Sequence, residues 1–199
     1  MSTKNNPIIE LIEKLPGNNE EKTYSLALIL VLKEQPLIGR IRLSKILGLS
    51  ERKVRTLIEK LAKQGIVEKK TYALRLSQNI AKLLEEINIH RIIDEQNILL
   101  INEIPNLCIL LENKIVSFRD YLVINIKDPE SIEVVCCRSG SNIIIPRVPE
   151  NLKKKYIELI NRYISEPKYD ELIIFWKKYK PFLYDASILL TLHVFFRNI

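Results

Sequence analysis

The sequence contains few of the residues that mark fibrous, disulfide-rich or membrane-spanning chains. Of its 199 residues only 5 are glycine, 3 are cysteine and 1 is tryptophan. So little glycine excludes collagen and low-complexity repeats, and three cysteines, two of them adjacent, make a poor disulfide framework. The apolar run from Leu26 to Leu32 is seven residues long, far short of the roughly 18 that cross a bilayer. We therefore expect a globular chain and no membrane partner.

Two further absences bear on location and chemistry. Residues 1–6 lack the basic patch and apolar stretch of a secretory signal, and the sparse cysteine suits a reducing interior, so we predict a cytoplasmic protein. The sequence shows no nucleophile elbow, no metal-binding His-Glu pair and no nucleotide-binding fingerprint. We therefore assign no catalytic residue, metal ion or cofactor, and do not expect an enzyme.

Positive charge is concentrated in one block of the chain. Between Arg40 and Lys82 there are 12 lysines or arginines against 3 glutamates, a net charge of +9, whereas the rest of the chain carries −2. A localised basic field attracts polyanions such as a phosphate backbone. A solvated basic face without a partner has the same composition, so the order of the residues must decide between the two.

The first half of the chain has mainly helical patterns. Apolar residues recur at helical spacing in several segments, and prolines or glycines end them. Two short apolar runs, joined by a polar link, predict a β-hairpin. We expect helices at 8–15, 23–35, 42–47, 51–64 and 76–89, with the hairpin strands at 66–68 and 73–76.

Beyond residue 97 the pattern changes to short β-rich runs, after a junction at 90–96. The fold class is therefore α+β, with one domain over residues 1–90 and a second α+β domain over 91–199. Apolar runs without alternation indicate a mostly antiparallel or mixed sheet covered on both faces. We expect strands at 98–101, 107–111, 121–126, 132–137, 142–145 and 172–175, and helices at 150–164 and 181–196.

A tight turn connects the helices predicted at 42–47 and 51–64. Gly48 can adopt the left-handed conformation that turns a chain after a helix, Leu49 supplies an apolar plug, and Ser50 can cap the next helix. On that helix the buried stripe consists of Val54, Leu57, Ile58 and Leu61, at positions i, i+3, i+4 and i+7. The opposite face is basic.

This arrangement resembles the winged helix-turn-helix family of transcription regulators over residues 23–87. The match continues through Gly65, where the helix ends, into the apolar start of the hairpin that forms the wing in that family. The resemblance implies that the helix at 51–64 enters the major groove of double-stranded DNA, with Arg52 and Thr56 facing base edges. The implied phosphate contacts are Arg42, Lys45, Lys53, Arg55, Lys60 and Lys63, with Lys69 and Lys70 on the wing.

The role of the second domain is left open by the sequence. It could form a homodimer, as expected for a regulator that reads two half-sites and as suggested by the long apolar helices at both ends of the chain. It could also sense a small-molecule effector. Two other classes compete: an enzyme with its active site in the second domain and an accessory winged helix, and a protein–protein adaptor in a transcription complex.

The cysteines also allow two interpretations. Cys136 and Cys137 are adjacent in a predicted strand, so their side chains should point to opposite faces of the sheet. Because cysteine packs as a small hydrophobe, we expect buried free thiols. The alternative is that Cys108 pairs across strands with one of them in a redox-sensing regulator.

Overall fold

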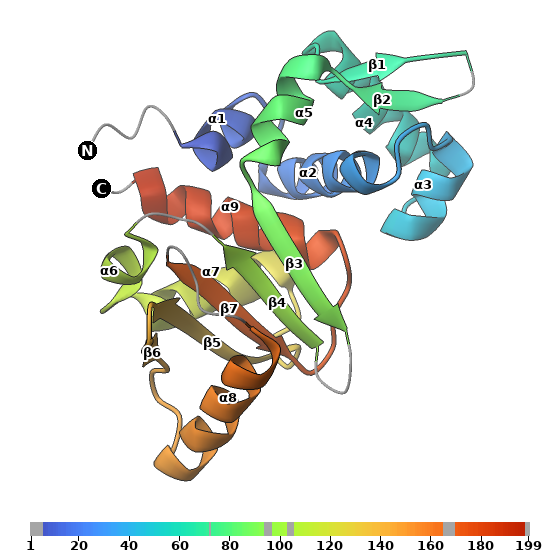
Figure 1. Cartoon of the computed structure of the whole chain (residues 1–199). Coiled ribbons are helices and arrows are strands. Elements are labelled where there is room, and N and C mark those ends of the chain that lie inside the picture. The colour runs from blue at the N-terminus through green and yellow to red at the C-terminus, as the bar shows by residue number, and fades with distance from the viewer. Residues whose placement is uncertain (1–5, 72, 94–96, 103–105, 165–169, 198–199) are drawn as a thin grey trace. The chain divides into compact units, whose positions relative to one another are not determined.

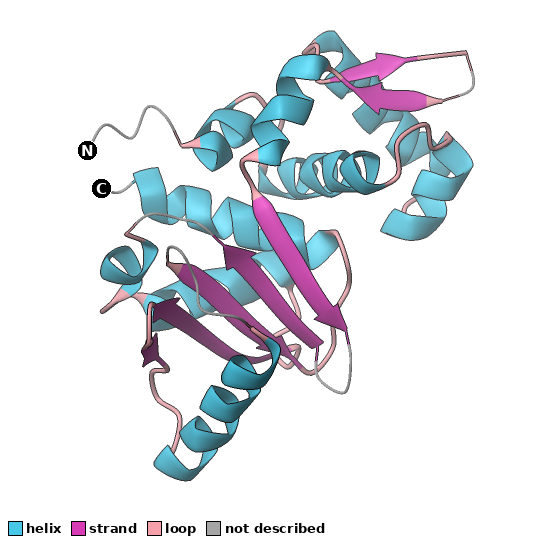
Figure 2. Ribbon diagram, viewed as in Figure 1, coloured by secondary structure: helices cyan, strands magenta, loops and turns pink. Residues whose placement is uncertain are grey.

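The computed structural model is of α+β class, and it divides into two compact units. One unit comprises residues 1–87 and 180–199, and the other comprises 88–179. Figure 2 shows the helices and strands of each unit. No helix within the described ranges is long and apolar enough to cross a bilayer. The structure describes residues 6–71, 73–93, 97–102, 106–164 and 170–197, and for 93 and 97–102 it describes the backbone alone.

Three helices that are distant in the sequence pack together in the first unit: α1 (Pro7–Glu13), α2 (Asn19–Glu34) and α9 (Leu183–Arg197). Every residue of α2 from Ser25 to Leu32 is buried, as expected of a helix that is apolar around most of its circumference. In α9 all residues from Tyr184 to His193 are buried. The long apolar helices at the two ends of the chain thus cover each other within one molecule, and they no longer indicate a dimer.

Helix α9 also lies outside the domain to which the sequence assigns it. The sequence predicts one domain over residues 91–199, but α9 packs with α1 and α2 and belongs to the first unit. The apolar surface of α2 requires a covering helix, and composition alone does not show that the last segment of the chain provides it.

The rest of the first unit consists of two helices, a hairpin and a further helix, shown in Figure 1. Antiparallel pairing places Val67 opposite Leu76 and Glu68 opposite Arg75. An isolated bridge joins Ile38 to Leu74, so the segment before the first of these helices is held against the hairpin. The elements are α3 (Arg40–Leu47), α4 (Glu51–Lys63), β1 (Val67–Lys69), β2 (Leu74–Leu76) and α5 (Gln78–Glu85).

The second unit is built on a five-stranded sheet. Its strand order is β3-β4-β7-β5-β6, and every pairing between the described strands is antiparallel. The junction expected at 90–96 is wrong, because residues up to Ile93 pair with β4 as a strand; residues 94–96 lie outside the described part. The strands are β3 (Asn88–Ile93), β4 (Asn97–Asn102), β5 (Ile132–Ser139), β6 (Asn142–Ile144) and β7 (Glu171–Trp176).

Two of the expected strands are helices: α6 (Leu107–Leu111) and α7 (Ile115–Ile126). A short apolar run does not by itself distinguish a strand from a buried helix. In α7 the buried residues Ile115, Phe118 and Leu122 lie at helical spacing, but the β-rich stretch at 121–126 covers only its last turns. The prediction of a strand at 121–126 was wrong because it did not include the helical periodicity that begins at Ile115.

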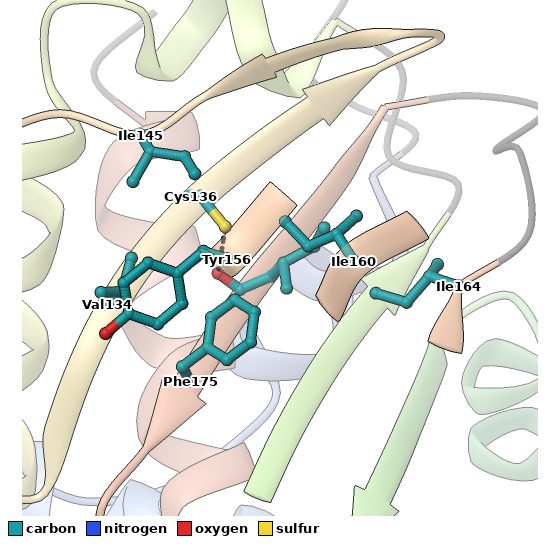
Figure 3. Packing of buried hydrophobic residues seen from close by; sticks show 8 residues of the cluster. Val134, Cys136, Ile145, Tyr156, Ile160, Ile164 and Phe175 are labelled. Atoms are coloured by element: carbon teal, nitrogen blue, oxygen red, sulfur yellow. Dashed lines mark hydrogen bonds between the residues drawn. The ribbon is translucent and has the colours of Figure 1, made fainter. Parts of the chain in front are cut away.

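The third helix of this unit, α8 (Glu150–Tyr163), packs on one face of the sheet. Figure 3 shows Tyr156 and Ile160 of α8 against Cys136 and Phe175, and the Tyr156 and Phe175 ring centroids are 4.9 Å apart. Every residue of β7 is buried, which agrees with the prediction of a sheet covered on both faces.

The cysteines correct the expectation of three free thiols. Cys108 of α6 forms a disulfide with Cys137 of β5, while Cys136 is free and buried. Adjacent strand residues point to opposite faces, so the disulfide holds α6 on the face of the sheet opposite α8. Burial raises the pKa of the Cys136 thiol well above its usual range, and it is therefore not a reactive thiolate.

A buried ion pair crosses the same sheet. Arg138 and Glu171 are partners in the β5–β7 register, the Arg138 Nη2 to Glu171 Oε2 distance is 2.6 Å, and each side chain is 4% exposed. Burial raises the pKa of Glu171, and the Arg138 guanidinium opposes that rise by favouring the carboxylate. The pair is a structural element of the sheet.

Candidate nucleic-acid interface

The turn between α3 and α4 has the local geometry that its residues predict. Gly48 adopts φ +63° and ψ +30°, a left-handed conformation that side-chain-bearing residues disfavour, and the Leu49 N–H donates to the Ser44 carbonyl at 3.0 Å. Ser50 caps α4 by accepting a hydrogen bond from the Lys53 N–H at 3.3 Å. The two helices are thereby fixed in a sharp, defined connection.

Helix α4 separates an apolar side from a charged side. Val54, Leu57, Ile58 and Leu61 are all buried, which confirms the predicted stripe. The face opposite this stripe is exposed to solvent and carries Arg52, Arg55, Thr56, Glu59 and Lys63. The cations of this helix therefore point outward, away from the core of the unit.

A basic groove lies where α3, α4 and the hairpin meet. Its volume is about 750 Å³ and Glu59 is the only acid among its lining residues. None of its bases forms an ion pair with a residue in the described part of the chain. The bases that line it, here called the basic groove residues, are Arg40, Arg42, Lys45, Arg55, Lys69 and Lys70.

The opposite flank of α4 has a different character. Arg52, Lys53 and Thr56 line a second depression, of about 400 Å³, together with Glu20 and Glu21 of α2. The carboxylates there lower the local positive potential. The two residues expected to face base edges, Arg52 and Thr56, are thus on the side of the helix that adjoins acids.

Two of the implied phosphate contacts have partners in this flank. Lys60 Nζ lies 2.7 Å from Glu21 Oε1, and the Lys60 side chain is 39% exposed. Lys53 Nζ lies 3.8 Å from Glu20 Oε1 and 5.5 Å from the centre of the Tyr24 ring. Phosphate binding by either lysine would compete with these contacts, although exposed pairs of this kind are weak.

The predicted site residues therefore fall into separate sets. The basic groove brings together Arg42, Lys45, Arg55, Lys69 and Lys70, while Lys63 is exposed and lines neither depression. Sequence reasoning omitted Arg40 from the site, although this arginine begins the basic block. It also missed Glu20 and Glu21, since nothing in the pattern of α2 shows that its first turn faces α4.

In the described part of the chain no three histidine, cysteine or acidic side chains are grouped so as to hold a metal ion. The basic groove presents exposed cations from three elements, α3, α4 and the hairpin. Such a set suits a polyanion, whose successive charges can each meet a different cation.

Comparisons with known proteins give a fold but no function. No protein-family model matches the chain, and no curated protein matches it. Among solved structures it is similar to the hypothetical protein PH0730 from Pyrococcus horikoshii OT3, with a TM-score of 0.57 and 18% sequence identity over 92% of this chain and 95% of that one. At this identity the likeness concerns the fold alone.

Proposed function

We propose that the chain binds double-stranded DNA through the basic groove and the exposed face of α4, as a transcription regulator. The observation that carries the proposal is the convergence on one groove of six exposed cations from α3, α4 and the hairpin, none of which forms an ion pair with a described residue. The order of the elements is that of a winged helix-turn-helix: α3, a sharp turn, the amphipathic helix α4 and the β1–β2 hairpin. This order supports the resemblance drawn from the sequence.

The roles of the residues follow from their positions. A major groove about 12 Å wide admits one helix, and the face of α4 opposite its buried stripe is exposed to solvent. Arg42, Lys45 and Arg55 would then meet phosphates beside that groove, and Lys69 and Lys70 would meet phosphates at the hairpin. Glu59 on the same face would accept a hydrogen bond from a cytosine amine or repel a misplaced phosphate.

Binding to a labelled duplex across a salt series tests the proposal. Six phosphate contacts give a slope of about −5 in a plot of log affinity against log salt, at about −0.9 per contact. Fluorescence anisotropy with a mixed-sequence duplex measures that slope, and a single strand of the same length serves as the control. Absence of binding at low salt, or equal affinity for the single strand, contradicts the proposal.

Dimerisation is a separate part of the proposal. A dimer would let two copies of α4 read half-sites about one helical turn apart. Sedimentation velocity at micromolar concentration, with and without the duplex, measures the state directly. A monomer under both conditions removes the two-half-site arrangement and leaves the DNA-binding proposal in place.

A further inference from the structure

The second unit contains a cavity that the proposed function does not use. Its volume is about 250 Å³, and it is bounded by α7, by the first half of β5 and by the segment that leads from β6 to α8. Its apolar walls include Ile115, Val134 and Val135, all of which are buried. Val116, Pro146 and Val148 complete the apolar lining.

Four charged side chains also line this cavity, two of each sign: Arg119, Arg147, Asp120 and Glu133. Neither arginine forms an ion pair with a residue in the described ranges. Arg119 and Asp120 are neighbours on one helix and do not face each other. A half-buried arginine without a carboxylate partner is costly, and a ligand that supplies one would stabilise it.

The acidic side of the cavity is held in position from α8. The Tyr156 hydroxyl donates a hydrogen bond to Glu133 Oε1 at 2.7 Å. Burial, and then the Glu133 carboxylate, raise the pKa of Tyr156, so the hydroxyl keeps its proton and remains a donor. This is the hydrogen bond that the Glu133 carboxylate accepts within the described ranges, so its second oxygen can accept one from a ligand.

The edge of β5 adds backbone groups to the lining. Strand β6 pairs with β5 only from Cys137 to Ser139, so the stretch from Ile132 to Cys136 has no strand partner on that side among the described residues. Outward N–H and C=O groups of an unpaired edge seek hydrogen bonds. The chain opposite this edge turns at Arg147, which adopts φ +55°.

We propose that this cavity binds a free α-amino acid with an aliphatic side chain. Two guanidinium groups suit the ligand's carboxylate, two carboxylates suit its ammonium group, and the six apolar residues surround its side chain. The volume of about 250 Å³ is below the roughly 300 to 1,000 Å³ of sites for drug-sized ligands, which favours a ligand of the size of one amino acid. The second unit would then sense amino-acid supply.

Calorimetric titration of the full chain with L-leucine tests the proposal, and binding does not depend on any DNA activity. Two truncated analogues serve as controls: 3-methylbutylamine lacks the carboxylate, and 4-methylpentanoate lacks the ammonium group. Saturable binding of L-leucine, at least about tenfold tighter than either analogue, is the expected result. No saturable binding of L-leucine or L-valine, or equal affinity for 4-methylpentanoate, overturns it.

Variants locate the site. Arg119→Gln and Asp120→Asn should each weaken L-leucine binding by at least about tenfold. Arg162→Gln on the exposed part of α8 should leave it unchanged. If Arg119→Gln fails to fold, Arg147→Gln, which alters an exposed side chain, takes its place. Affinity unchanged in both the Arg and the Asp variants overturns the assignment.

Discussion

The basic groove of the first unit and the Arg138–Glu171 pair of the second unit use charge in opposite ways. In the first unit, six cations of the basic groove are unpaired with any described residue and line an open groove. In the second unit, Arg138 is buried and paired with Glu171 across two strands of the sheet. The comparison shows that an arginine's surroundings, more than its presence in the sequence, determine whether it can meet a ligand.

The same distinction applies within α4. Arg55 lines the basic groove, whereas Lys60, five residues further along, lies against Glu21. A count of basic residues treats the two alike. Their different surroundings predict different effects on duplex affinity and on the free energy of unfolding.

The largest effect on stability is expected from Arg138→Met. This change leaves the Glu171 carboxylate buried without a partner, at a cost of about 3 to 5 kcal/mol in the free energy of unfolding. Without Arg138 the pKa of Glu171 rises further, so the folded variant binds a proton more readily than the unfolded chain. The deficit should therefore shrink as the pH falls from about 7 to about 5. Urea unfolding at both pH values measures it.

The double variant Arg138→Met with Glu171→Leu is the control. Replacement of both partners by apolar side chains removes the buried, unpaired carboxylate of Glu171 and should recover most of the lost free energy of unfolding. A single variant as stable as the wild type would show that the pair is not structural.

Reduction of the disulfide should have the next largest effect. The bond between Cys108 and Cys137 closes a loop over a sequence separation of 29 residues, for which the loss of chain entropy predicts about 3.5 kcal/mol. The urea midpoint should fall when dithiothreitol is added. A variant with serine in place of both Cys108 and Cys137 is the control, and its urea midpoint should be the same with and without dithiothreitol. If the urea midpoint of the wild type is also unchanged by dithiothreitol, the disulfide does not form in solution.

The hairpin lysines should influence binding and not stability. Lys69→Ala with Lys70→Ala removes two exposed cations from the basic groove. We expect duplex affinity to fall about tenfold and the salt slope to become shallower by about 2. Anisotropy measures the binding and urea unfolding checks the fold. A lower affinity with an unchanged slope would mean that the lysines do not meet phosphates.

The smallest effect is expected on the acidic flank of α4. Glu20→Gln with Glu21→Gln removes two carboxylates and releases Lys53 and Lys60. Exposed pairs are worth about 0.2 to 1 kcal/mol, so duplex affinity should rise by up to about fivefold. The matched control neutralises two exposed acids of the second unit, Glu130 and Glu158. An equal rise in duplex affinity in both variants would mean that the net charge of the chain, and not the position of these carboxylates, determines the effect.

Much of the first unit could be predicted from the sequence because its signals are local. The turn at Gly48, the cap at Ser50 and the stripe that begins at Val54 depend on residues close together in the chain. The packing of α9 on α2 could not be predicted, since neither segment carries a mark that identifies the other as its partner.

The second unit was harder to predict because its structure depends on contacts between segments that are distant in the sequence. The run at 107–111 is apolar and short, which fits a strand and a buried helix equally. The disulfide depends on how α6 is placed over β5, a consequence of tertiary packing. At the candidate site, the sequence indicated every basic groove residue except Arg40, but the division of the cations between the basic groove and the acidic flank required the position of α2.

The most direct measurement compares two triple variants at one low salt concentration. The first replaces Arg42, Lys45 and Arg55 of the basic groove by alanine, and the second replaces Lys154, Arg162 and Lys178, three exposed cations of the second unit. Both lose the same charge. Loss of duplex affinity on the order of a hundredfold in the first, with little change in the second, is the predicted result. Equal losses in the two variants would contradict a DNA-binding role for the groove.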